Sequence, residues 1–279
     1  MKKWHLIIDV EKCVDCNNCF LACKDEHVDN EWPGYTRSQP RHGHRWINIM
    51  RTERGQYPIV DVAYRPTTCM HCEDAPCIKG SRGSISKRPD GVVVIDPDKA
   101  KGQRELTKAC PYQAIWWNEE HDTPQKCTFC AHLLDQGWKK PRCVQACPTG
   151  ALRAEYVEDA EMSRICQVNN LEVLQPEYNT HPSVYYQNLY RFTKCFIAGS
   201  VAVNSNGVTD CAEGVRISLF SDQKKLSEAV TDNFGDFKID NLSANSGYYT
   251  IEIEMIGFKK TTVTVELTAS QNIGTVYLG

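Results

Sequence analysis

Long apolar runs are missing from this 279-residue chain: no 18 consecutive residues are apolar, so we expect no membrane span. The opening stretch MKKWHLIIDVEKC lacks the apolar core of a signal peptide, so we expect no Sec-type signal and a cytoplasmic location. An excess of one charge is absent too, because the formal net charge is only −3, which gives no case for nucleic-acid binding. The sequence has no GxGxxG, no P-loop and no nucleophile elbow, so it offers no pattern for binding an organic substrate.

Cysteine, in contrast, is abundant: there are 15, an odd number that cannot all pair in disulfides within one chain. A chain of this length and 41% hydrophobic content can bury a core without disulfides. So many cysteines in an unexported chain indicate metal binding in a reducing compartment. Twelve of them fall between residues 13 and 147, and we expect structural roles for the three scattered ones, Cys166, Cys195 and Cys211.

The cysteine spacing resembles that of bacterial ferredoxins. The first group lies in KCVDCNNCFLACKDEH, residues 12–27, with the spacing C-x2-C-x2-C-x3-C. Other groups lie in CMHCEDAPC, KACPYQAI, CTFC and PRCVQACPTGAL, and Cys-Pro followed by a short turn occurs at Cys110 and Cys147. In the ferredoxin run, the last cysteine of a group binds the neighbouring cluster.

Simple geometry explains why the ligands must cross between groups. Three thiolates at x2 spacing wrap one corner of a cubane, and the fourth ligand must arrive from elsewhere. The stretch NCFLACKDEH predicts a helix, in which Cys23 lies one turn beyond Cys19, roughly 6 Å along the axis. Cys23 therefore serves a neighbouring cluster. Lys24 stands where proline usually follows the fourth cysteine, so the helix can continue there.

The crossover predicts three [4Fe–4S] clusters that use all twelve cysteines. The predicted ligand sets are Cys13, Cys16, Cys19 and Cys147 (cluster 1); Cys69, Cys72, Cys77 and Cys110 (cluster 2); and Cys127, Cys130, Cys143 and Cys23 (cluster 3).

The full ferredoxin pattern would hold a fourth cluster, and its four ligand positions are all altered here. They are occupied by Ser81, Ala100, Gln103 and Leu106. Random loss would have left unpaired cysteines, so one cluster has been removed cleanly. We expect side chains to fill the space, because a void of that size would be costly.

Other metal sites explain the pattern less well. CTFC with CVQAC could bind zinc, but zinc does not explain C-x2-C-x2-C or the Cys-Pro turns. A radical-SAM site needs C-x3-C-x2-C, and Glu26 stands where its last cysteine would be. Twelve thiolates fill three cubanes, so no metal is assigned to the four histidines near the cluster loops, which could instead tune potentials by hydrogen bonds: His42, His44, His71 and His132.

The composition changes near residue 196. We predict an α+β chain with a three-cluster ferredoxin-type domain (1–151), a connector (152–195) and an all-β domain (196–279). In the connector, EYVEDAEMSRICQVNNLEVL predicts a helix and QPEYNTHPSVYYQNLYRF an extended segment. Seven short alternating runs, with turns such as Asn206-Gly207, predict an antiparallel sandwich or barrel. GVTDCAEGVRISLF, TDNFGDFKID and GYYTIEIEMIGFKK resemble the carboxypeptidase-regulatory, transthyretin-like domain, which is usually structural.

Several stretches resemble the iron–sulfur subunit of molybdopterin oxidoreductases of the dimethyl-sulfoxide-reductase family: CNNCF, RHGHRW, RPTTCMHCEDAPC, QKCTFCAHLLD and VYYQNLYRF. The resemblance covers nearly the whole chain. Within the family, it is strongest to the small (β) subunits of enzymes that act on phenols. It implies a large catalytic partner subunit holding molybdenum and two molybdopterin guanine dinucleotides. This chain itself would be non-catalytic and would carry electrons beside that partner.

Three other interpretations stay open. The stretch QACPTGAL around Cys147 is closer to the ordinary ferredoxin form, which leaves room for a relative acting on another phenol, such as a resorcinol hydroxylase. A free polycluster ferredoxin would be a small diffusing carrier, with no reason to hold a β domain. Thirdly, the clusters could mainly hold the fold, since transfer of hydroxyl groups between phenols needs no net electron flow.

Overall fold

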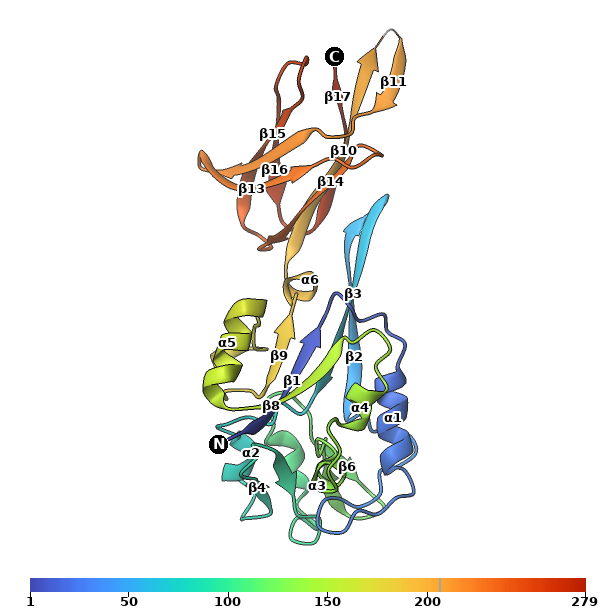
Figure 1. Ribbon diagram of the computed structural model, residues 1–279, viewed down its shortest axis with the longest axis vertical. Helices are drawn as coiled ribbons and strands as arrows, with labels where there is room; N and C mark the ends of the chain where they lie inside the picture. Colours follow the sequence, from blue (N-terminus) through green and yellow to red (C-terminus); the bar gives the residue numbers. More distant parts are fainter. Residues whose placement is uncertain (206) are drawn as a thin grey trace. The chain divides into compact units, whose positions relative to one another are not determined.

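The computed structural model describes residues 1–205 and 207–279, so Asn206 of the expected Asn206-Gly207 turn lies outside the described residues. The chain divides into two compact units. The first comprises residues 1–50 and 64–189, and the second comprises residues 51–63 and 190–279. Figure 1 shows the elements of both units along the chain.

A three-stranded sheet lies in the first unit. Its central strand β1 (Lys3–Asp9) pairs antiparallel with β8 (Leu152–Val157) and parallel with β9 (Val184–Gln187). Leu6, Ile7 and Ile8 of β1 are at most 2% exposed, as expected for a central strand.

Two strands of this sheet come from the segment expected to be a connector. The expected helix, residues 155–174, is confirmed over α5 (Asp159–Asn169), but its first residues, 155–157, belong to strand β8 (Leu152–Val157) and residues 170–174 lie beyond the end of α5. The pairing of β8 with β1 decided this, because backbone groups next to a buried strand need ladder partners. Most of the expected connector therefore belongs to the first unit, as does β9.

Short elements and loops surround the cysteine groups. Helix α1 (Asn18–His27) confirms the helix predicted for NCFLACKDEH, with Lys24 inside it. No helix among the described residues is long and apolar enough to cross a membrane. The remaining elements are α2 (Pro76–Lys79), β4 (Ile85–Lys87), β5 (Val93–Ile95), η1 (Arg104–Lys108), β6 (Trp116–Asn118), β7 (Thr123–Gln125), α3 (Ala131–Asp135), α4 (Arg142–Gln145) and η2 (Pro176–Tyr178).

Two four-stranded sheets form most of the second unit, together with the short helix α6 (Tyr190–Thr193). One sheet contains β10 (Cys195–Ser205), β11 (Val208–Cys211), β14 (Asp236–Leu242) and β17 (Gln271–Leu278). The other contains β12 (Arg216–Ser221), β13 (Lys224–Val230), β15 (Gly247–Glu254) and β16 (Thr261–Leu267). Buried side chains of both sheets form one core, including Ile251, which is fully buried.

The sequence predicted seven antiparallel strands, and the described residues of this segment contain eight. The missed strand is β11, whose four residues are all exposed, so it has no alternating apolar pattern to reveal it. The other pairings in these two sheets are antiparallel, as expected, and β17 departs from the pattern by pairing parallel with β10.

A hairpin of β2 (Ile47–Gln56) and β3 (Ile59–Thr68) connects the two units along the chain. Its tip, residues 51–63, belongs to the second unit, although these residues fall within the range 1–151 expected for the first domain. The tip lies some 130 residues before β10 in the chain, so no local sequence pattern could reveal this association.

Side chains explain why the tip belongs there. The Arg54 guanidinium donates hydrogen bonds to Asp61 at 2.6 Å and to Asp240 at 2.7 and 2.8 Å. It also lies 5.3 Å from the ring centre of Phe196. A Cβ at Gly55, where φ is +89°, would come within 2.5 Å of that ring, so only glycine fits.

Candidate iron–sulfur cluster sites

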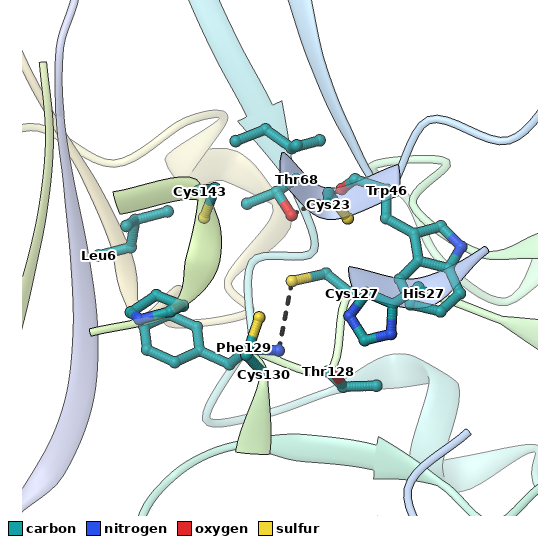
Figure 2. Close-up of a pocket in the computed structure, with 12 residues that line it drawn as sticks. Leu6, Cys23, His27, Trp46, Thr68, Cys127, Thr128, Phe129, Cys130 and Cys143 are labelled. Atoms are coloured by element: carbon teal, nitrogen blue, oxygen red, sulfur yellow. Dashed lines mark hydrogen bonds between the residues drawn. The ribbon is translucent and has the colours of Figure 1, made fainter. Parts of the chain in front are cut away.

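The four cysteines of the predicted cluster 3 line one enclosed space in the first unit. Cys23 comes from α1, Cys127 and Cys130 from the loop between β7 and α3, and Cys143 from α4. Their sulfur atoms point into the same space, as Figure 2 shows. The other walls of this space are mainly apolar and include Leu6.

The four cysteines of the predicted cluster 2 line a second space in the first unit. Cys77 comes from α2, while Cys69, Cys72 and Cys110 come from loops. The remaining walls are apolar apart from Tyr112 and Lys126, and they include Pro111 of the Cys-Pro turn.

The cysteines of the predicted cluster 1 lie close enough for their charges to act on one another. Besides burial, Cys147 in its ionised form raises the pKa of Cys13. The pKa of Cys19 is raised by burial and by the same effect from Cys13, Cys16 and Cys147. Cys19 is buried, whereas Cys16 is exposed. This set therefore lies nearer to solvent than the other two.

The loops that begin at Cys13, Cys69 and Cys127 share one unusual backbone feature. In each, the residue before the second cysteine has a positive φ: 55° at Asp15, 44° at His71 and 56° at Phe129. None of these is glycine, so each costs of order 1 kcal/mol or more and must be held by its surroundings. In the third loop, the turn lets the Phe129 N–H donate to the Cys127 sulfur at 3.3 Å. The shared turn indicates that the three loops hold the same kind of ligand.

These geometries fit iron–sulfur clusters. Among the described residues, no three His, Cys, Asp or Glu side chains converge on the position of a single metal ion. In two of the three predicted sets, the four thiols instead border a space, as the ligands of a cubane must.

The sets also lie next to one another. Besides the effect of burial, an ionised Cys19, from the first set, is close enough to raise the pKa of Cys23 and Cys143 of the third set. An ionised Cys69, from the second set, likewise raises the pKa of Cys127 of the third set. The set that contains Cys23 is therefore a neighbour of both other sets.

Burial dominates the electrostatics of the thiols. It raises the pKa of Cys130 and of Cys72 to about 12 and that of Cys77 to about 11. It raises the pKa of Cys23 and Cys143 well above the ordinary value. Without iron these thiols stay protonated at neutral pH, so cluster binding must release protons.

The four altered ligand positions of the absent cluster are close together. Ser81, Ala100 and Leu106 are at most 1% exposed. Gln103 accepts a hydrogen bond from the Ser84 hydroxyl at 3.2 Å, and its backbone links it to Ala100 and Leu106. The buried, hydrogen-bonded state of these residues agrees with the expectation that side chains fill this position.

Some residues at the cavities were missed by sequence reasoning. His27 lies four residues after Cys23, on the same side of α1, and lines the same cavity. Burial lowers its pKa to about 3, so its ring is neutral. Of the four histidines named from sequence, three are also buried: His44, His71 and His132. The four-residue spacing between Cys23 and His27 was a sequence signal that both line the same cavity. Thr68 and Lys126 also line cysteine cavities, but no sequence pattern indicated this.

The comparisons with known proteins agree with the fold and the site. Residues 60–156 match the 4Fe-4S dicluster domain, and residues 197–276 match the carboxypeptidase regulatory-like domain, which confirms the predicted fold class. The pyrogallol hydroxytransferase small subunit of Pelobacter acidigallici is 49% identical over 262 residues, 92% of each chain.

More distant relatives match the cluster-bearing part. The iron–sulfur subunit of the arsenate respiratory reductase of Shewanella sp. (strain ANA-3) is 30% identical over 65% of this chain and 94% of its own length. A sulfite dehydrogenase subunit of Allochromatium vinosum is 34% identical over 67% of this chain and 83% of its own length.

The cysteine cavities and the ferredoxin-type loops define an iron–sulfur protein with an added β domain. More narrowly, the chain belongs to the family of iron–sulfur small subunits of molybdopterin oxidoreductases. It is thus a non-catalytic electron-transfer subunit of an enzyme complex, and a large catalytic subunit is its partner.

Proposed function

We propose that this chain is the iron–sulfur subunit of a two-subunit molybdenum enzyme that acts on phenols, namely a pyrogallol–phloroglucinol transhydroxylase. The observation that carries the proposal is the 49% identity to a pyrogallol hydroxytransferase small subunit over 92% of both chains. The partner subunit holds molybdenum and two molybdopterin guanine dinucleotides, and catalysis takes place there. The complex works in the cytoplasm.

The chain binds three [4Fe–4S] clusters through the twelve predicted cysteines. The two cysteine-lined cavities and the repeated turn in the loops that begin at Cys13, Cys69 and Cys127 support this number. The cluster of Cys127, Cys130, Cys143 and Cys23 is a neighbour of both others, and electrons pass through it between these two. The domain division expected from the sequence is kept as a proposal with two changes: most of residues 152–195 join the cluster domain of residues 1–151, and residues 51–63 join residues 196–279, which act as a scaffold.

We expect about twelve irons and twelve labile sulfides per chain, because each cubane contains four of each. The measurement is iron and sulfide analysis of the anaerobically purified protein. About eight or about sixteen of each would show that the ligand sets are wrong.

The chain alone is expected to convert no phenol, because it supplies no catalytic group beside the clusters. The test compares the isolated chain with the complex of both subunits, with pyrogallol and resorcinol as separate substrates. Conversion of pyrogallol to phloroglucinol by the complex alone supports the proposal, whereas turnover by the isolated, molybdenum-free chain would refute it. Activity of the complex on resorcinol and not on pyrogallol would favour a resorcinol hydroxylase, as the sequence around Cys147 allows.

The alternative that the clusters only hold the fold is tested on the same complex. If they carry electrons, reduction of the molybdenum site must reach them, and their reduced spectrum will appear. Clusters that stay oxidised after the molybdenum site is reduced would favour the structural role.

A further inference from the structure

A buried lysine lies beside the cluster 2 cavity. Lys126 follows directly after β7, is 3% exposed and lines the space bordered by Cys69, Cys72, Cys77 and Cys110. Its neighbour in the chain, Cys127, is a ligand of the predicted cluster 3. Lys126 therefore stands at the boundary between two predicted clusters.

The ammonium group of Lys126 has no carboxylate partner in the described part of the chain. Its hydrogen bonds go to two backbone carbonyl oxygens, those of Val93 and of Cys127, the latter at 3.1 Å. A buried charge is costly unless an opposite charge accompanies it, and two carbonyl dipoles do not supply one. The opposite charge must come from elsewhere.

The cysteine sulfurs that border the same cavity can supply that charge once they hold a cluster. Lys126 lines the same cavity as Cys77 and Cys110 of the second set, and it directly precedes Cys127 of the third. The cysteines of the first set are not among the described residues that line this cavity. An oxidised [4Fe–4S] core of charge 2+ with four thiolates has a net charge of −2, which one electron makes −3.

We propose that Lys126 is the fixed counter-charge shared by clusters 2 and 3, and that it raises the reduction potentials of both relative to cluster 1. The inference rests on the ligand sets given under the proposed function. A fixed positive charge stabilises the reduced cluster more than the oxidised one, because the reduced cluster carries one more negative charge. Electrons entering this chain therefore collect on the two clusters beside Lys126.

A second lysine provides a matched comparison. Lys87 donates to the carbonyl oxygen of Cys72, a ligand of cluster 2, at 3.1 Å. Unlike Lys126 it forms an ion pair, with Glu73 at 2.6 Å, and its side chain is 17% exposed. Its charge is largely offset by that carboxylate, so it should affect the cluster less.

The experiment replaces Lys126 by methionine, which keeps a similar unbranched side chain, and by arginine, which keeps the charge. Lys87→Met is the control. Each variant is purified as the two-subunit complex, its iron is counted, and its clusters are titrated with dithionite through mediators while electron paramagnetic resonance is recorded. One electron from dithionite reduces one cluster.

In the Lys126→Met complex, we expect the ratio of reduced to oxidised cluster at a fixed potential to fall at least tenfold for clusters 2 and 3. For a one-electron couple, this corresponds to a decrease of about 59 mV in the reduction potential of each cluster. The third cluster should titrate as in the native complex. Lys126→Arg should stay near the native potentials, and Lys87→Met should shift cluster 2 by less than Lys126→Met does.

Unchanged potentials in Lys126→Met, or an equal shift of all three clusters, would overturn the proposal. If Lys126→Met fails to hold its clusters while Lys126→Arg holds them, the requirement for a positive charge is supported. Loss of clusters in both variants would show that Lys126 only supports the loop. The iron count of the unaltered complex tests the ligand sets separately, so the two ideas can fail independently.

Discussion

Replacing Cys110 by alanine should remove one cluster and leave the other two intact. Cys110 comes from a different loop than Cys69, Cys72 and Cys77, and it lines the same cavity. Without it the cubane lacks its fourth ligand, so iron should fall from about twelve to about eight per chain, or to about eleven if a three-iron form remains. The reduced spectrum should lose one component. An unaltered spectrum would mean that Cys110 belongs to a different set.

The matched control is Ser81→Cys, which adds a thiol at the position of the absent cluster. It should add no iron, because Ala100, Gln103 and Leu106 supply no ligands. Ser81 is fully buried, so the new thiol would have no space for a cubane beside it and would stay protonated. Four extra irons in this variant would show that this position can still bind a fourth cluster.

Replacing Arg54 by methionine should destabilise the second unit by about 3 kcal/mol, since removing one partner of a buried ion pair leaves the other charges uncompensated. Arg54 is 8% exposed and bridges Asp61 of the hairpin tip and Asp240 of β14. Arg191 and Lys238 still contact Asp61 after the change, which limits the loss. The measurement is amide hydrogen exchange in β10 and β14 with increasing urea.

Arg216→Met is the control, because Arg216 is exposed and lies 3.8 Å from Glu228, so its loss should cost no more than about 0.5 kcal/mol. Equal exchange rates in the two variants would contradict a structural role for the Arg54 cluster.

The pH dependence gives a second signature of the same cluster. Burial alone would raise the pKa of Asp61, but hydrogen bonds from Arg54, Lys238 and Arg191 outweigh it and hold the pKa well below its ordinary value. A depressed pKa contributes stability above the unfolded value of about 3.9 that is lost as the pH falls below it. This acid-side loss should be smaller in Arg54→Met.

The sequence alone was sufficient to predict iron–sulfur clusters, which the match to a 4Fe-4S domain supports. Thiols at x2 spacing with Cys-Pro turns have few other uses, and the three ligand sets, which stay predictions, rest on spacing and chain direction. Helix α1 and the two-part α+β fold class could also be predicted from the sequence, because both depend on local patterns. Family membership followed from whole stretches of sequence and agrees with the 49% identical relative.

Only the tertiary structure decided the features that depend on contacts distant in the chain. Strand β8 formed because β1 offered backbone partners, and the hairpin tip joined the second unit because Arg54 meets Asp240, 186 residues away. Strand β11 has no apolar alternation, so pairing with β10 alone defines it. Lys126 looks like any lysine in the sequence, and its burial beside two cysteine sets exists only after folding. Local spacing determines which metal groups the chain can hold, whereas long-range packing determines the charges around them.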